Sequence, residues 1–221
     1  MGEALTFGIE VRTLLPLFVA VPLAACLLIQ LFARDKHLLS GWLTNLAMLA
    51  LVVMSFRMIG ESALYHLGGW PSPIGIDLRL DNLATLMLLV INTVGLAVGL
   101  YSVDYMKRYT ASAHFYGLFL LMVTGMNGVV LAGDLFNLYV FLEVAAVASY
   151  ALVAFGCAHE ELEASFKYII LRSLSSALIL VGVALVYGIT GTLNLAHMSG
   201  RLAETGLNAP LLLAFGLFIC G

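Results

Sequence analysis

Glu143 is the residue whose type and position most clearly indicate chemistry in this sequence. It lies in the apolar run Leu135–Phe155, nine residues after Asp134. At a rise of 1.5 Å per residue that spacing is about 13 Å, close to the middle of a hydrocarbon core roughly 30 Å thick. An ionisable group at that depth costs at least about 2.5 kcal/mol, so Glu143 is a candidate proton site. Asp134 starts the run, and we interpret it as the helix N-cap.

Two basic residues in the next apolar segment are candidates to modulate or relay the proton of Glu143. These are Lys167 and Arg172. A nearby cation favours the ionised form of a carboxyl group and desolvation favours the neutral form, so movement of the cation would drive proton uptake and release. One alternative is that Lys167 pairs with Glu163, four residues earlier on the same helix. The other is a static ion pair that holds two helices in register.

Weaker relay candidates are His159 and His197, interpreted as loop residues, and Asn127 within the preceding apolar run. A histidine titrates near neutral pH, although solvated loop histidines are common, and a buried asparagine also satisfies a neighbouring helix. The sequence contains no phosphate-binding loop, no Cys/His ligand set and no Ser/His/Asp arrangement. We therefore predict no metal site, no cofactor in this chain and no catalysis by the chain alone.

The elements that position these residues are predicted to be membrane helices. Of the 221 residues, 62% are hydrophobic and 10% are charged, whereas soluble domains carry about 25% charged residues. This composition excludes a soluble enzyme, and a net charge of −3 without a basic cluster argues against nucleic-acid binding. Backbone groups in lipid must satisfy their own hydrogen bonds, so apolar runs of this length are helices. The predicted fold is an all-α membrane protein with six complete transmembrane helices and a truncated seventh, at Leu14–Phe32, Leu39–Ile59, Leu83–Val103, Phe115–Ala132, Leu135–Phe155, Ser165–Ile189 and Ala209–Gly221.

The connections between the spans indicate an orientation. The segment Glu61–Asn82 is rich in glycine and proline, and it is predicted to be an extended interfacial loop. Basic residues divide five to four between the two sides of the membrane, which predicts an external N-terminus in a multi-pass protein of the cell (inner) membrane. The five are Arg34, Lys36, Lys107, Arg108 and Lys167, and the four are Arg12, Arg57, Arg79 and Arg201.

From about Asp77 onward the sequence resembles the antiporter-type subunits shared by Mrp cation/proton antiporters, respiratory complex I and membrane-bound hydrogenases. The likeness is strongest to the D-type chain of Mrp antiporters and its hydrogenase relatives. The resemblance implies that Glu143 is the fifth-helix glutamate of a proton channel and that Lys167 and Arg172 lie in its sixth-helix basic region. The residues that carry it are Tyr101-Ser102-Val103-Asp104-Tyr105-Met106, Gly125-Met126-Asn127-Gly128, the run from Gly133 to Glu143, Ala148-Ser149-Tyr150, Phe166-Lys167-Tyr168 and Gly191-Thr192-Leu193-Asn194.

The resemblance also implies the organisation and partners of the chain. Residues 1–113 are expected to form helices 1–3 with the long outer loop, and residues 114–221 the start of the first proton-channel repeat. Family members have about fourteen helices in inverted repeats, and a lysine of the seventh helix partners the glutamate. Because this sequence stops before that lysine, we expect another chain to supply the lysine and the second half.

The predicted function is therefore that of a membrane subunit in a multisubunit ion-translocating complex that moves protons, or protons and sodium. Its expected partners are the lipid bilayer and other membrane subunits. Any oxidoreductase activity would belong to the whole assembly. The alternative is a structural scaffold subunit, or a truncated remnant, with inert ion pairs.

Overall fold

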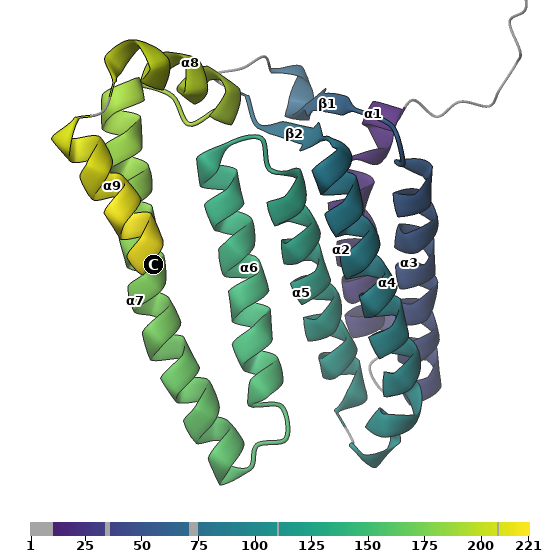
Figure 1. Cartoon of the computed structure of the whole chain (residues 1–221). Helices are drawn as coiled ribbons and strands as arrows, with labels where there is room; N and C mark the ends of the chain where they lie inside the picture. Colours follow the sequence, from purple (N-terminus) through teal and green to yellow (C-terminus); the bar gives the residue numbers. More distant parts are fainter. Residues whose placement is uncertain (1–10, 34–35, 71–74, 110, 207) are drawn as a thin grey trace, which may run out of the picture.

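Six apolar helices form the framework of the computed structural model, which describes residues 11–33, 36–70, 75–109, 111–206 and 208–221. Each is long and apolar enough to cross a membrane: Val11–Phe32, His37–Arg57, Asn82–Arg108, Ser112–Leu131, Leu135–Val153 and His159–Thr190. A shorter apolar helix, Ala209–Cys220, follows. The helices run up and down beside one another (Figure 1). The predicted all-α membrane fold, with six spans and a partial seventh, is confirmed.

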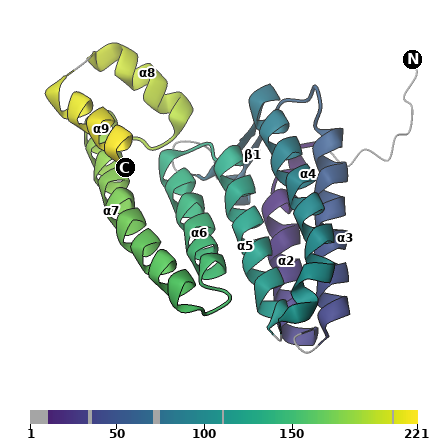
Figure 2. The ribbon, with the colours of Figure 1, turned by 60° about the horizontal axis from the view of Figure 1, so that its bottom comes forward.

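The elements fall into two groups along the chain. Helices α2 to α5 form a compact bundle, and α6, α7 and α9 extend away from one side of it (Figure 2). The bounds are α1 Val11–Leu14, α2 Leu17–Phe32, α3 His37–Arg57, α4 Asn82–Tyr105, α5 Ser112–Leu131, α6 Leu135–Val153, α7 His159–Thr190, α8 Leu195–Thr205 and α9 Ala209–Cys220, with short 3-10 turns η1 Leu67–Gly69 and η2 Met106–Arg108.

Neutral hydrogen bonds tie the bundle of α2 to α5 together. Pro22 has no N–H to donate to the carbonyl of Phe18 one turn earlier. The side-chain amide of Asn127 on α5 donates to that carbonyl instead, at 3.2 Å, and also to Asn92 Oδ1 on α4, at 3.1 Å. Asn92 in turn donates to Ser55 Oγ on α3, at 3.1 Å. One chain of hydrogen bonds therefore links all four helices.

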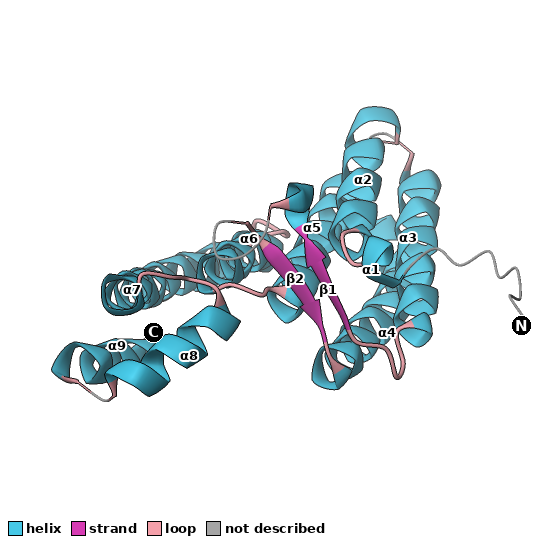
Figure 3. Cartoon of the chain, turned by 90° about the horizontal axis from the view of Figure 1, so that it is seen from above, coloured by secondary structure: helices cyan, strands magenta, loops and turns pink. Residues whose placement is uncertain are grey.

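A β-hairpin closes one end of the bundle, which we call the hairpin end. Strands β1 (Ala63–His66) and β2 (Asp77–Leu80) pair antiparallel and lie across the helix ends (Figure 3). The expectation of an extended loop throughout this segment was wrong, and residues 71–74 of that loop lie outside the described residues. The signal for β2 is its alternation, because Leu78 and Leu80 are buried while Arg79 between them is exposed.

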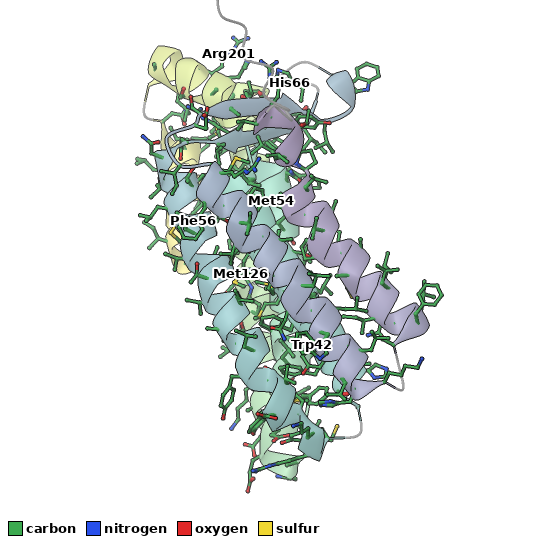
Figure 4. All side chains as sticks on the ribbon, turned by 90° about the vertical axis from the view of Figure 1, so that its right-hand side faces the viewer. Trp42, Met54, Phe56, His66, Met126 and Arg201 are labelled. Atoms are coloured by element: carbon green, nitrogen blue, oxygen red, sulfur yellow. The ribbon has the colours of Figure 1, made fainter. Side chains whose placement is uncertain are left out.

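Helix α8 also lies at the hairpin end, where the sequence predicted a loop around His197. Asn194 caps it by accepting from the N–H groups of Ala196 and His197. Met198 and Leu202 lie one turn apart and pack on the buried cluster formed by α7 and α9. The missed signal was an N-cap followed by apolar residues at helical spacing. Figure 4 shows His66 and Arg201 at this end and Trp42 towards the opposite end.

Candidate functional site

The helices α6 and α7 meet along a seam of polar side chains. They run antiparallel, so residues that lie four apart on α6 face residues four apart on α7. Tyr139 Oη lies 2.9 Å from Ser176 Oγ, and Glu143 faces Arg172 one turn further along. Beyond them Ser165 Oγ donates to the carbonyl of Tyr150, and Ser149 Oγ to Tyr168 Oη. The seam places a charged pair between hydroxyl contacts inside two membrane spans.

Glu143 and Arg172 form a loosely held ion pair at the centre of this seam. Glu143 is the ninth of the 19 residues of α6, so it lies at the middle of its span. Arg172 Nη2 lies 3.5 Å from Glu143 Oε1, and that oxygen is buried without a hydrogen-bond partner. The side chain of Glu143 is 30% exposed and that of Arg172 is 18% exposed. The pair is therefore neither tightly hydrogen-bonded nor sealed by the described residues.

A cavity of about 340 Å³ opens beside Glu143. It lies between α5 and α6, and its wall is entirely apolar. The residues that line it are Leu121, Tyr139, Val140, Glu143, Val144 and Val147. Tyr139 and Ser176 were not among the sequence candidates. Their spacing of four residues from Glu143 and from Arg172 was the signal that could have found them.

The two basic candidates have different surroundings. Lys167 Nζ lies 2.5 Å from Glu163 Oε1, the i, i+4 alternative considered above, and its side chain is 69% exposed. Helix α7 has 32 residues, about 48 Å at 1.5 Å per residue, so it is longer than a 30 Å hydrocarbon core is thick. Lys167 lies five residues, about 7.5 Å, nearer the start of α7 than Arg172, which reaches Glu143. The structure brings one of the two cations to the glutamate, and a role for Lys167 there stays a prediction.

The weaker candidates are spread over the molecule. His159 begins α7 and His197 lies within α8, so both belong to helices rather than to the loops expected, and both are exposed. Asn127 is fully buried in the hydrogen-bond chain of the α2 to α5 bundle. In the described part of the chain, none of these three forms a hydrogen bond or an ion pair with Glu143 or Arg172.

Asp134 accepts a hydrogen bond from Asn137 N at 2.6 Å, which caps the first turn of α6. Burial raises the pKa of Asp134 above its ordinary value, and the nearby Asp77 carboxylate raises it further. The hydrogen bond from Asn137 opposes this shift. Among the described residues, no group of three His, Cys, Asp or Glu side chains is arranged to hold a metal ion.

Comparison with known proteins shows which family this arrangement resembles. Residues 132–221, which contain the seam, match the model described as NADH:quinone oxidoreductase/Mrp antiporter, and residues 71–116 match the N-terminal model of complex I chain 5. The D-type chain of a probable K⁺/H⁺ antiporter from Rhizobium meliloti (strain 1021) is 39% identical over 218 residues, which are 94% of this chain and 40% of that protein. This chain is therefore similar to the antiporter-like membrane subunits.

Chains in solved structures of membrane complexes share its fold. A chain of the Mrp complex from Dietzia sp. DQ12-45-1b superposes with a TM-score of 0.82 and 29% identity, over 96% of this chain and 40% of that one. A chain of an archaeal membrane-bound sulfane sulfur reductase gives a TM-score of 0.84 and 33% identity, over 93% of this chain and 43% of that one. The antiporter-like chain therefore spans about 40% of the length of its relatives, and those relatives come from multisubunit membrane complexes.

Proposed function

We propose that this antiporter-like subunit contributes a glutamate-based proton site to a multisubunit ion-translocating complex, and that Glu143 is the proton acceptor. The observation that carries the proposal is the loose, partly open ion pair of Glu143 and Arg172 at mid-span. A buried pair that serves only stability is expected to be short, saturated with hydrogen bonds and closed to solvent. Here Glu143 Oε1 is buried and lacks a hydrogen bond, which suits a group that changes its protonation state.

Arg172 is the proposed counter-ion of Glu143, with Nη2 at 3.5 Å from Oε1. If Arg172 moves away, desolvation favours the neutral acid and Glu143 takes up a proton, and its return expels that proton. The hydroxyl groups of Tyr139 and Ser176 lie one turn towards the hairpin end and are available to carry protons or bind water. The proton, or a sodium ion in exchange for it, is the proposed cargo.

Helices outside these 221 residues are proposed to cover the open side of the pair. Leaving the side chains of Glu143 and Arg172 30% and 18% exposed to lipid would be costly, so a protein surface is needed there. The relatives are longer than this chain, which supports a further helix carrying a polar or basic residue. Whether that helix belongs to a second polypeptide, as expected from the sequence, is tested by intact mass measurement of every subunit in the purified complex.

The orientation proposed is that the hairpin end is external and the membrane is the cell (inner) membrane. Lys36, Lys107, Arg108 and Lys167 lie at the opposite end, which the positive-inside rule places in the cytoplasm. Arg34, the fifth residue of that count, lies outside the described residues. Labelling of single cysteines introduced at Lys107 and at Arg79 with an impermeant reagent tests this assignment.

The decisive experiment is Glu143→Gln in the assembled complex, assayed by ion-driven proton flux in proteoliposomes. We expect flux to fall roughly a hundredfold, the lower end of what a positioned acid–base group contributes to proton transfer. Glu163→Gln is the matched control, because that glutamate pairs with Lys167 on the exposed part of α7. Unchanged flux with intact assembly would contradict the proposal and favour the scaffold alternative.

A double variant further separates a proton site from a purely structural ion pair. If the Glu143–Arg172 pair is only a clamp, either single substitution strands a buried charge, and Glu143→Gln with Arg172→Gln restores assembly and flux together. If Glu143 carries the proton, the double variant restores assembly while flux stays low.

A further inference from the structure

Three chain segments far apart in sequence form a junction at the hairpin end. Gly133, in the turn between α5 and α6, donates its N–H to the carbonyl of Asp77 on β2 at 2.8 Å. A Cβ atom on Gly133 would lie 2.7 Å from that carbonyl oxygen, so the approach requires glycine. Asp134 forms an antiparallel bridge with Asn194, in the turn between α7 and α8. The junction therefore joins the hairpin to the starts of α6 and α8.

Two buried carboxyl groups at this junction are satisfied to different degrees. Asp77, 3% exposed, has His66 Nδ1 at 2.6 Å from one oxygen and accepts a hydrogen bond from Asn194 Nδ2 at 2.8 Å on the other. Asp134, 8% exposed, uses one oxygen to cap Asn137, and its Oδ2 is buried without a partner. Both oxygens of Asp77 therefore have polar partners, whereas Oδ2 of Asp134 has no hydrogen-bond partner among the described residues.

A cleft of about 550 Å³ reaches the junction from outside the bundle. Gly133, the residue before Asp134, lines it together with Asp77 and Asn194. The remaining titratable groups on its wall are Arg79 and Asp81 from the hairpin and His197 from α8, and His66 contacts Asp77 from β1. The cleft therefore reaches Asp77 directly and reaches the residue that precedes Asp134.

We propose that the Asp134 carboxyl group holds an exchangeable proton at the hairpin end, with the Asp77 carboxylate as the neighbouring anion that retains it. In this exchange a hydronium ion in the cleft gives its proton to the Asp134 carboxylate, leaving water and a neutral acid, and the reverse step releases the proton. The proton site at Asp134 is inferred from the geometry of the junction.

The use of that proton in transport rests on the proposed function. Asp134 immediately precedes α6, the helix that carries Glu143 about 13 Å further on. That separation is too long for a direct transfer. Tyr139 lies between them along α6, and its hydroxyl group meets Ser176 in the seam with α7, so it is the hydroxyl placed to continue the route.

The test is infrared difference spectroscopy of the assembled complex between alkaline and neutral pH, which detects the carbonyl stretch of protonated carboxyl groups. We expect Asp134→Asn to abolish one such band, since asparagine keeps the helix cap but binds no proton. Asp77→Asn should leave the band but shift its titration to lower pH, because it removes the adjacent negative charge. Asp104→Asn, an exposed partner of Lys107 at the opposite end, is the control and should change nothing.

The proton site at Asp134 and the transport role of Glu143 can be refuted independently. An Asp134→Asn complex with an unchanged spectrum would overturn the proton site, as would an Asp77→Asn complex whose band does not move. Loss of the band in Asp134→Asn together with wild-type flux in Glu143→Gln would support the proton site while refuting the transport role of Glu143. When both hold, Asp134→Asn should also displace the pH profile of flux, and Asp104→Asn should not.

Discussion

The hydrogen bond between Asn127 and Phe18 gives a stability prediction that depends on a proline. Pro22 leaves the Phe18 carbonyl without its intrahelical donor, and the Asn127 amide supplies one at 3.2 Å. Asn127→Leu should strand that buried carbonyl, at a cost of about 1–3 kcal/mol. It also removes the bond to Asn92, worth about 0.6 kcal/mol for a typical contact between membrane helices. The expected total loss is roughly 1.6–3.6 kcal/mol.

Pro22→Ala restores an N–H that can bond to Phe18 O within α2. In that background Asn127→Leu should cost only about 0.6 kcal/mol, because only the bond to Asn92 is then lost. The saving relative to the Pro22 protein is about 1–3 kcal/mol. The assay is unfolding by SDS titration in mixed micelles, followed by circular dichroism, on all four members of the double-mutant cycle. Thr124→Val is the matched control on α5, since Thr124 donates to Leu120 O of its own helix. Its effect should not depend on Pro22.

If the free-energy changes of Asn127→Leu and Pro22→Ala add to within about 0.5 kcal/mol, Asn127 does not replace the donor that Pro22 lacks. The cycle also separates the structural role of Asn127 from the predicted relay role. A structural asparagine loses flux only in proportion to lost assembly, so flux returns in the Pro22→Ala background. A relay residue loses flux in both backgrounds.

Three further predictions follow from the junction and from α7. Asp134→Asn should stabilise the protein at neutral pH and leave its stability unchanged in strong acid. The reason is that folding raises the pKa of Asp134, so the wild type loses stability as the pH rises from the pKa of the unfolded state to that of the folded state. Thermal unfolding measured across this pH range would show the difference. Gly133→Ala should cost about 1–3 kcal/mol, since its Cβ meets the Asp77 backbone, and an unchanged melting temperature would contradict this. Lys167→Met should change stability by at most about 0.5 kcal/mol and leave flux intact, because the pair with Glu163 is exposed; a tenfold loss of flux would instead establish the predicted modulating role.

The spans and the glutamate were predictable because each depends on local sequence. A run of about 20 apolar residues identifies a span by itself, and a carboxylate in its middle is conspicuous without knowledge of any neighbour. The choice between Lys167 and Arg172 was not predictable. Five residues rotate a helix by about 140°, so the two cations point to different sides, and only the packing of α7 on α6 decides which one meets Glu143.

The contacts of the junction and of the hydrogen-bond chain could not be predicted from the sequence either, because they also depend on the packing of distant elements. Asn194 meets Asp77 across 117 residues, and Asn127 meets Phe18 across 109. A cap, a proline and a buried amide are each readable alone, but their pairing depends on which helices are neighbours. The strands of the hairpin were missed because four residues are too few for a strong alternating signal.

The buried polar groups of α2 to α5 differ in kind from those of α6. In the described part of α2 to α5, the buried polar side chains are neutral, and those of Asn92, Ser55 and Thr124 have fixed partners. Such bonds hold helices together and have no charge state to change. Among the described residues, the carboxyl groups with a buried oxygen that lacks a partner are Asp134 at the start of α6 and Glu143 at its middle. An incompletely satisfied acid in a membrane helix is costly in either charge state, and the presence of both such acids on α6 supports the proposal that this helix changes its protonation while the bundle stays fixed.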